Sequence, residues 1–465
     1  MPEPTPPPAL SADQQDTAPA LPAPSALVAG ITEGPLRPAI FALAWPAVGT
    51  TLFQVLFNIT DTFWVGRTLG PAALAGVSVA SYAVWIMTSI GELVGVGLTA
   101  VAARRHGERN PAAAADATGT ALWMALAMGL AVAAGGVALL GPLFGAMQTS
   151  AEVSRYGREF LVVQLLGAAL VYGYFVVAAA FRSSGDTRTP FYLLGAAVLV
   201  NLVLDPVMIL GIGPFPALGV YGAALATVLT RGLGFVVGWV ILMRRGSIRS
   251  VFRPRIAGTI ARIGLPMTLT GVLFSLIYVW LARVTASFGT PALAALGIGH
   301  KVEGISYMTC VGFALAAETM VGQNLGAGRA DRARRAGWTT VRIASVPTLI
   351  LGVLFLLVPA ELAGIFTDDP ATISAAASYL RVVALAQIAI AFEQVFEGAL
   401  GGAGYTIWPM VWVVALSAVR IPLAPWAAGR WGLTAIWWVL TVTAVGRAVA
   451  LTLLWQRGGW DRSRV

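Results

Sequence analysis

Residues 185–206 read GDTRTPFYLLGAAVLVNLVLDP, and residues 404–425 read GYTIWPMVWVVALSAVRIPLAP. Each segment contains an apolar run close to the ~20 residues that a membrane-spanning helix needs. A shift of 219 residues superimposes a Gly, a Thr and two Pro of the first segment on those of the second. The same shift aligns Leu74 with Leu293 and Gly107 with Gly326. The pair therefore predicts an internal repeat built from membrane-spanning helices.

The composition of the whole chain agrees with a membrane protein. The chain has 465 residues, 57% hydrophobic and 11% charged, whereas soluble domains are about 25% charged. Its mean hydropathy is +0.79. These values exclude a disordered chain, a disulfide scaffold and nearly all classes of soluble enzyme. The net charge of +9 is attributed to loop arginines rather than to nucleic-acid binding.

Hydrophobic runs predict an all-α polytopic protein with twelve spans, six in each half of the repeat. Because six is even, the halves have parallel topology and an axis along the membrane normal relates them, as in many secondary transporters. The predicted spans are 37–66, 73–103, 116–140, 158–181, 190–212, 217–243, 258–288, 292–325, 336–360, 374–400, 406–428 and 432–456.

Five regions follow from this division. They are a disordered, Pro/Ala-rich N-terminal tail (1–35), an N-lobe (36–243), a linker (244–257), a C-lobe (258–457) and a C-terminal tail (458–465). Seventeen arginines fall on one side of the predicted spans and four on the other. Under the positive-inside rule, both termini are expected to be cytoplasmic, in the plasma (inner) membrane.

Polar residues inside the predicted spans indicate a site in the N-lobe. Gln54, Asn58 and Asp61 share one face of the first span, and Asn201 and Asp205 share a face of the fifth. Ionisable groups inside a membrane face a cavity or a partner. Two carboxylates and an amide on different helices could bind a cation or share a proton.

Thr227 and Arg231 are spaced i, i+4 on the sixth span. Thr227 could give a hydroxyl to the same cation, or it could simply pack against a neighbouring helix. Arg231 could instead pair with Asp61, in which case the aspartates would be structural rather than functional.

The second half differs from the first in its charges. Asn201 aligns with Arg420 and Asp205 with Ala424, so only the N-lobe retains the acidic pair. In the C-lobe, Glu303 or Glu393 could pair with Arg283 or Arg420 in a polar network. This network is a candidate for a second titrating site. Gln54, Asn58, Tyr172 and Tyr278 are expected to line a substrate cavity.

Five segments together resemble the multidrug and toxic compound extrusion (MATE) family over about residues 35–457. They are LAWPAVGTTLFQVLFNITDTFWVGRTLGPAALAGVSVA (43–80), FRSSGDTRTPFYLLGAAVLVNLVLDP (181–206), GVYGAALATVL (219–229), GLPMTLTGVLFSL (264–276) and ETMVGQNLGAGRADRARRAGW (318–338). The resemblance implies two six-helix bundles arranged as a V. It also implies efflux of cationic and amphipathic compounds in exchange for H⁺ or Na⁺.

Within that family, the chain resembles the DNA-damage-inducible F-type (DinF-like) prokaryotic branch. The resemblance implies that Asp61, Asn201, Asp205 and Thr227 form the cation-coupling site for H⁺ or Na⁺, and that Gln54 lines the cavity. The sodium-type branch relies instead on a seventh-span Glu and a tenth-span Asp. Here the seventh span has Arg283 and no acid, and the tenth has two glutamates.

Other functions remain as alternatives. The nearest is a lipid-linked oligosaccharide flippase of the same superfamily, which would need central Arg or Lys side chains to hold phosphates. A passive channel and an intramembrane enzyme are further rivals. The chain has no GxxxxGK[ST], HExxH or GxSxG motif, so no enzymatic activity and no cofactor beyond the coupling ion are expected. The expected partners are drugs or organic cations and the lipid bilayer, with the chain as a monomer and without nucleic acid.

Overall fold

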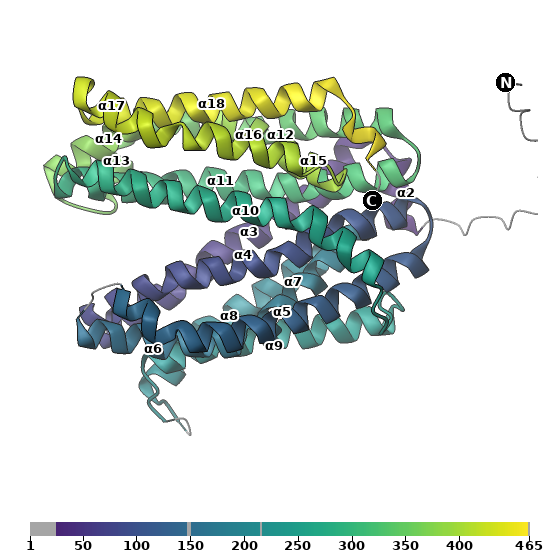
Figure 1. Cartoon of the computed structure of the whole chain (residues 1–465), viewed down its shortest axis with the longest axis horizontal. Coiled ribbons are helices and arrows are strands. Elements are labelled where there is room, and N and C mark those ends of the chain that lie inside the picture. Colours follow the sequence, from purple (N-terminus) through teal and green to yellow (C-terminus); the bar gives the residue numbers. More distant parts are fainter. Residues whose placement is uncertain (1–24, 147–149, 214–215, 464–465) are drawn as a thin grey trace, which may run out of the picture.

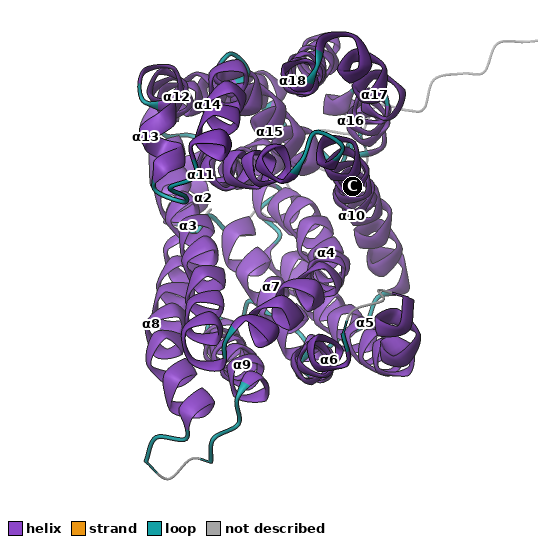
Figure 2. Ribbon diagram, turned by 90° about the vertical axis from the view of Figure 1, so that its left-hand side faces the viewer, coloured by secondary structure: helices purple, strands orange, loops and turns teal. Residues whose placement is uncertain are grey.

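The structure is a computed structural model that describes residues 25–146, 150–213 and 216–463. The described residues form helices and no strands, as expected (Figure 2). The N-terminal part contains α2 (Ala26–Thr32), α3 (Leu36–Leu69), α4 (Pro71–Gly107), α5 (Pro111–Ala146), α6 (Ala151–Leu166), α7 (Ala168–Ser183), α8 (Arg188–Leu210) and α9 (Val220–Arg244).

The C-terminal part contains the remaining helices. They are α10 (Pro254–Ala286), α11 (Thr290–Gly326), α12 (Ala330–Leu357), α13 (Pro359–Gly364), α14 (Pro370–Ala384), α15 (Gln387–Gly402), α16 (Ile407–Ala418), α17 (Arg420–Trp431), α18 (Leu433–Arg457) and a 3₁₀ turn, η1 (Trp460–Arg462). Figure 1 shows the two sets of helices as separate layers, which meet along α3, α4, α10 and α11.

The number of spans agrees with the sequence-based prediction. Among the described residues, ten spans are long and apolar enough to cross a membrane. One of these ten consists of α16 and α17 together. Two further spans are bent pairs, α6 with α7 at 53° and α14 with α15 at 59°. Counting each pair as one span gives twelve. The bent pairs are the fourth span of each half, so the bend itself follows the repeat.

The two halves touch through equivalent glycines. A Cβ added to Gly107 at the end of α4 would lie 2.0 Å from the carbonyl oxygen of Gln323, and one added to Gly326 at the end of α11 would lie 2.0 Å from that of Arg104. The shift of 219 residues relates each member of the first contact to its counterpart in the second. The contacts are therefore a pseudo-symmetric pair, and they join the lobes at one end of the molecule.

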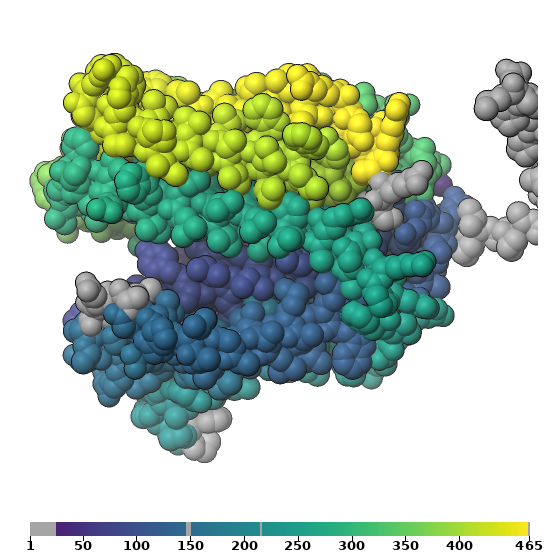
Figure 3. Space-filling view, viewed as in Figure 1, coloured from purple at the N-terminus to yellow at the C-terminus, as the bar shows by residue number. Residues whose placement is uncertain are grey.

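We call that end the arginine-rich end. It carries the loop after α4, the connection from α9 to α10 and the start of α12, and α2 and the C-terminal turn lie there too (Figure 1). At the opposite end the space-filling view is hollowed between the lobes, below α10 and above α5 (Figure 3). The lobes thus form the expected V, closed at the arginine-rich end.

Two predicted boundaries need correction. The predicted linker 244–257 is shorter, because α9 extends to Arg244 and α10 begins at Pro254, a residue tolerated in the first turn of a helix. The N-terminal tail 1–35 is not disordered throughout. Residues 1–24 lie outside the described residues, but Ser25 caps α2, and Ile31 of that helix is buried.

Candidate functional site

The N-lobe side chains that the sequence singled out meet across three helices. Thr227 of α9 donates a hydrogen bond from its hydroxyl to Oδ2 of Asp61 on α3, at 2.9 Å. On α8, Nδ2 of Asn201 donates to Oδ1 of Asp205, also at 2.9 Å. The carboxyl groups of Asp61 and Asp205 lie close enough to interact with each other. The structure therefore brings all four side chains into one cluster.

This cluster is almost shut off from solvent. Asn201 and Asp205 have no exposed surface, and Asp61 and Thr227 are only slightly exposed. Several of its oxygens accept no hydrogen bond from the described residues, namely Oδ1 of Asp61, Oδ1 of Asn201 and Oδ2 of Asp205. Buried polar atoms normally have a partner, because leaving one unpaired costs about 1–3 kcal/mol. The open oxygens therefore fit a bound proton, cation or water.

Arg231 lies close to the cluster without forming an ion pair with it. No ion pair among the described residues joins Arg231 to Asp61, and the guanidinium carbon instead lies 5.1 Å from the ring centre of Phe57. Arg231 is buried, and its Nε has no partner among the described residues. The alternative in which Asp61 serves only as the ion-pair partner of Arg231 is not the arrangement observed.

The predicted cavity residues behave differently from one another. Gln54 is half-buried and Asn58 is exposed on α3, so both remain available to line a cavity. Tyr172 of α7 was expected there too, but it is fully buried against α4. Its hydroxyl donates a hydrogen bond to the carbonyl oxygen of Met87 on α4 at 2.6 Å. Its ring lies against Gly91, which has no side chain to displace it. Tyr172 is a packing residue.

The C-lobe contains a polar network, but its pairing differs from the prediction. Glu393 forms a buried ion pair with Nε of Arg447 at 2.9 Å, and Arg447 also donates to Ser417 at 3.0 Å. Arg420 is fully buried and donates from Nε to the hydroxyl of Thr443 at 2.7 Å. The predicted pairing of Glu393 with Arg283 or Arg420 is therefore wrong, and the signal for its actual partner was an arginine, Arg447, inside an apolar span.

Glu303 is linked to this network through Tyr379, His300 and Tyr278, whereas Arg283 lies outside it. Glu303 accepts a hydrogen bond from the hydroxyl of Tyr379 at 2.7 Å. Tyr278, which was expected to line the substrate cavity, is half-buried beside His300 and under the guanidinium of Arg420, with 5.5 Å between the guanidinium carbon and the ring centre. Arg283 is exposed near the end of α10 and lies over Trp280. Its predicted pairing with Glu303 or Glu393 is wrong, because no ion pair among the described residues involves it.

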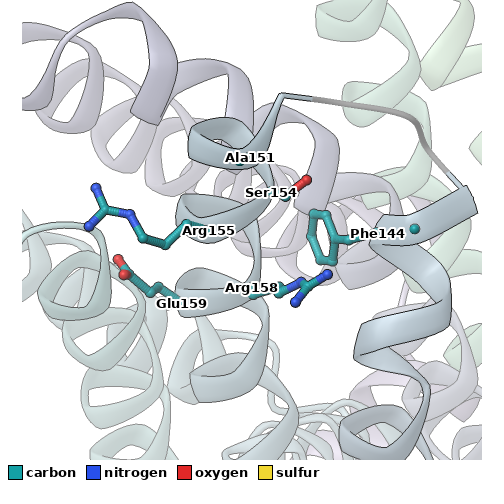
Figure 4. A pocket seen from close by; sticks show the side chains of 7 residues that line it. Phe144, Ala151, Ser154, Arg155, Arg158 and Glu159 are labelled. Carbon is teal, nitrogen blue, oxygen red and sulfur yellow. The ribbon is translucent and has the colours of Figure 1, made fainter.

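A pocket at the far end of the N-lobe is separate from these clusters. It lies between the end of α5 and the start of α6, with Arg158 directed toward Phe144 and with Arg155 and Glu159 on the other side (Figure 4). None of the predicted site residues lines it. Across the described residues, no group of three or more His, Cys, Asp or Glu could hold a metal ion, and the N-lobe cluster differs from such groups because amide and hydroxyl oxygens complete it.

Both halves of this arrangement match one family model. The model named MatE matches residues 46–207 and again residues 266–426. The chain belongs to the MatE family. The two matches begin 220 residues apart and end 219 apart, which reproduces the internal repeat of the chain. The first match includes Asp61, Asn201 and Asp205 of the N-lobe cluster.

Individual MATE relatives match along nearly the whole chain. A Pseudomonas aeruginosa protein named "Probable multidrug resistance protein NorM" is 31% identical over 454 residues, covering 92% of this chain and 90% of that protein. The FAD transporter of Shewanella oneidensis is 26% identical over 438 residues, covering 92% and 96%. A solved multidrug resistance MATE transporter in an outward-facing conformation has a TM-score of 0.86 at 22% identity, covering 94% and 98%.

Proposed function

We propose that this MATE protein is a secondary active multidrug exporter that exchanges cationic or amphipathic compounds for H⁺ or Na⁺. The observation that carries the proposal is the N-lobe cluster, in which Asp61 and Asp205 face each other with unpaired buried oxygens. The names of the multidrug resistance relatives support efflux as the direction of transport. The resemblance to the DinF-like branch supports the N-lobe as the place of coupling.

The cluster suits a proton that is gained and lost in each cycle. Two facing carboxylates repel each other when both are charged, so one proton shared between them relieves the repulsion. The hydroxyl of Thr227 and the amide of Asn201 each stabilise one carboxylate when it is ionised. Protonation therefore changes the contacts among α3, α8 and α9, which can reshape the N-lobe and release the drug.

The same oxygens fit Na⁺ as an alternative coupling ion. Carboxylate, amide and hydroxyl oxygens are hard ligands of the kind that hard cations prefer. Asp61, Asn201, Asp205 and Thr227 could supply them, with the unpaired oxygens turned toward the ion. Either ion would be the transported partner of the exchange rather than a resident cofactor.

Orientation follows from charge. The arginine-rich end would face the cytoplasm under the positive-inside rule, which places both termini there and directs the open end of the V outward. The protein would then reside in the inner membrane as a monomer and switch by alternating access. Each net charge that the exchange moves down the membrane potential would release ~2.3 kcal/mol of free energy per 100 mV.

A flippase for phosphate-bearing lipids is not favoured. Its phosphates would need free basic side chains in the cleft, and the arginines of three C-lobe spans, Arg283, Arg420 and Arg447, do not provide them together. Arg447 is paired with Glu393, Arg420 is buried against Thr443, and Arg283 is exposed beside Trp280. One relative is named as a transporter of FAD, and the transport assay therefore compares cationic with anionic substrates.

The test is counterflow of ethidium or norfloxacin in proteoliposomes that contain the full chain, under an imposed ΔpH or ΔpNa. Asp61→Asn and Asp205→Asn should each abolish gradient-driven transport, and Asp61→Asn should also abolish drug resistance in cells at normal membrane expression. Asp331→Asn, a change of the same kind at an exposed site on α12, should leave transport intact. Undiminished transport by both cluster variants would overturn the N-lobe mechanism, and flux independent of either gradient would indicate a channel.

A further inference from the structure

Helix α2 lies at the arginine-rich end, beside the ends of both lobes (Figure 1). It is a helix of seven residues, begins at the capping residue Ser25 and is followed at Leu36 by the first span. A helix this short is not stable alone in water. Its folded state must therefore depend on contacts with the rest of the protein.

The C-lobe holds the end of α2 through Arg329, which directly precedes α12, and Arg332, which lies in the first turn of α12. Nη1 of Arg329 donates to the carbonyl oxygen of Thr32 at 2.6 Å. Nη2 of Arg332 donates to the carbonyl oxygen of Ile31 at 3.0 Å and also to that of Gly34. The last carbonyls of a helix have no partner within the helix and carry its negative dipole end, so arginines suit them well.

The N-lobe holds the same segment from the other side. Nη2 of Arg109, in the loop after α4, lies 3.3 Å from Oε1 of Glu33. Nη2 of Arg329 lies 3.4 Å from the same oxygen. Ile31 packs against Gly185 between α7 and α8, where a Cβ would lie 2.6 Å from the Ile31 side chain. One carboxylate thus bridges arginines of the two lobes.

We propose that residues 25–34 form an inter-lobe clasp that holds the arginine-rich end closed. The clasp rests on the proposed alternating-access function, in which the lobes must separate at this end to admit substrate from the cytoplasm. Separation moves Arg109 away from Arg329, so Glu33 must release at least one of them. The clasp therefore favours the state that is open at the opposite end.

The clasp shifts the equilibrium between the two states but does not prevent the arginine-rich end from opening. Glu33, Arg109 and Arg329 are each about 40% exposed, and exposed ion pairs contribute little individually. Loss of the Glu33 bridge should therefore raise the fraction of molecules open at the arginine-rich end by about two- to fivefold. Loss of the whole segment also removes the arginine contacts and buried Ile31, and the shift should be larger. High salt should reproduce part of the effect of losing Glu33.

The experiment measures the distance between the lobes with spin labels at Arg188→Cys and Arg335→Cys. Both sites are exposed, one in each lobe, and the buried native Cys310 is replaced by Ala. Glu33→Gln should increase the population with the long distance, and deletion of residues 1–34 should increase it further. Glu108→Gln is the matched control, because Glu108 pairs with Arg105 inside one lobe at 2.6 Å.

Two results would overturn the clasp. One is an unchanged distance distribution in both Glu33→Gln and the deletion variant, and the other is an equal shift in Glu33→Gln and Glu108→Gln. Because Glu33→Gln removes only a half-exposed charge, it keeps the test valid if the deletion variant does not fold. The distances are measured without drug or ion gradient. Failure of the clasp is thus distinguishable from failure of ion-coupled efflux, which the Asp61 and Asp205 variants test.

Discussion

Gly107 and Gly326 occupy equivalent positions in the two halves, and each lies against a backbone carbonyl of the other half. At these two places α4 and α11 approach so closely that no side chain fits between them. The arginine-rich end is closed by backbone contact, and this contact must be broken and remade in each proposed transport cycle.

A methyl group at this contact should therefore loosen the closed end. In Gly107→Ala the new Cβ would lie 2.0 Å from the carbonyl oxygen of Gln323, so α4 and α11 must move apart. We expect a lower melting temperature and a longer distance between labels on the two lobes. Gly258→Ala on α10 is the control, because open space surrounds that position. A Gly107→Ala protein identical to the control in both measurements would contradict the proposed role of this contact.

The hydroxyl of Thr227 should affect ion coupling through its bond to Asp61. Thr227→Val keeps the shape of the side chain but removes the donor, and a hydrogen bond to a charged group is worth about 1.5–3 kcal/mol. We expect the ion concentration needed for half-maximal transport to change by about tenfold or more. Thr227→Ser should restore the wild-type value.

Thr230→Val is the matched control for this change. Among the described residues, the Thr230 hydroxyl bonds only to carbonyl oxygens of its own helix, at 2.8 Å and 3.1 Å. Transport kinetics of both valine variants in proteoliposomes provide the comparison. Equal effects of Thr227→Val and Thr230→Val would mean that the threonines matter only for packing.

The ion pair of Glu393 and Arg447 should stabilise the C-lobe. Both side chains are buried, about 6% exposed, and removing one partner of such a pair costs about 3–5 kcal/mol because the other charge stays buried alone. We expect Glu393→Gln to lower the melting temperature clearly in thermal unfolding of the purified protein. The double variant Glu393→Gln with Arg447→Met should recover part of the loss. A double variant worse than the sum of the single variants would exclude this explanation.

Asp186, outside the spans between α7 and α8, should make stability depend on pH. Burial alone would raise its pKa, but hydrogen bonds from Arg245 and Thr189 outweigh burial and hold the pKa below the usual 3.8. A depressed pKa stabilises the folded state above the unfolded pKa, and that stability is lost as the pH falls through the folded value.

Asp186→Asn should therefore melt slightly lower than the wild type at neutral pH. The difference should shrink as the pH falls below about 3.8 and the wild-type carboxyl becomes protonated. The effect is small because Arg245 is half-exposed. Thermal unfolding between neutral and acidic pH measures it, and a difference that grows on acidification would have the wrong sign.

The sequence predicted the parts of the site that depend on one helix at a time. Asn201 and Asp205 share a face of α8 because four residues make about one helical turn, and the structure pairs them as expected. By contrast, the contact of Thr227 with Asp61 joins α9 to α3. Spacing along the chain does not show which residues of two different helices meet. The predictions that Tyr172 lines the cavity and that Arg283 forms an ion pair were wrong for the same reason. The position of a residue in the sequence does not show which side of its helix faces the neighbouring helices.

The number of spans, their repeat and the asymmetry of acids between the halves could be predicted from local sequence alone. A bilayer requires each span to be long and apolar on its own, so these features can be read locally. The tertiary structure alone decided that Glu393 pairs with Arg447, that α2 bridges the lobes, and that two glycines close one end. Such contacts depend on the rotation and approach of whole helices, which packing between distant segments sets.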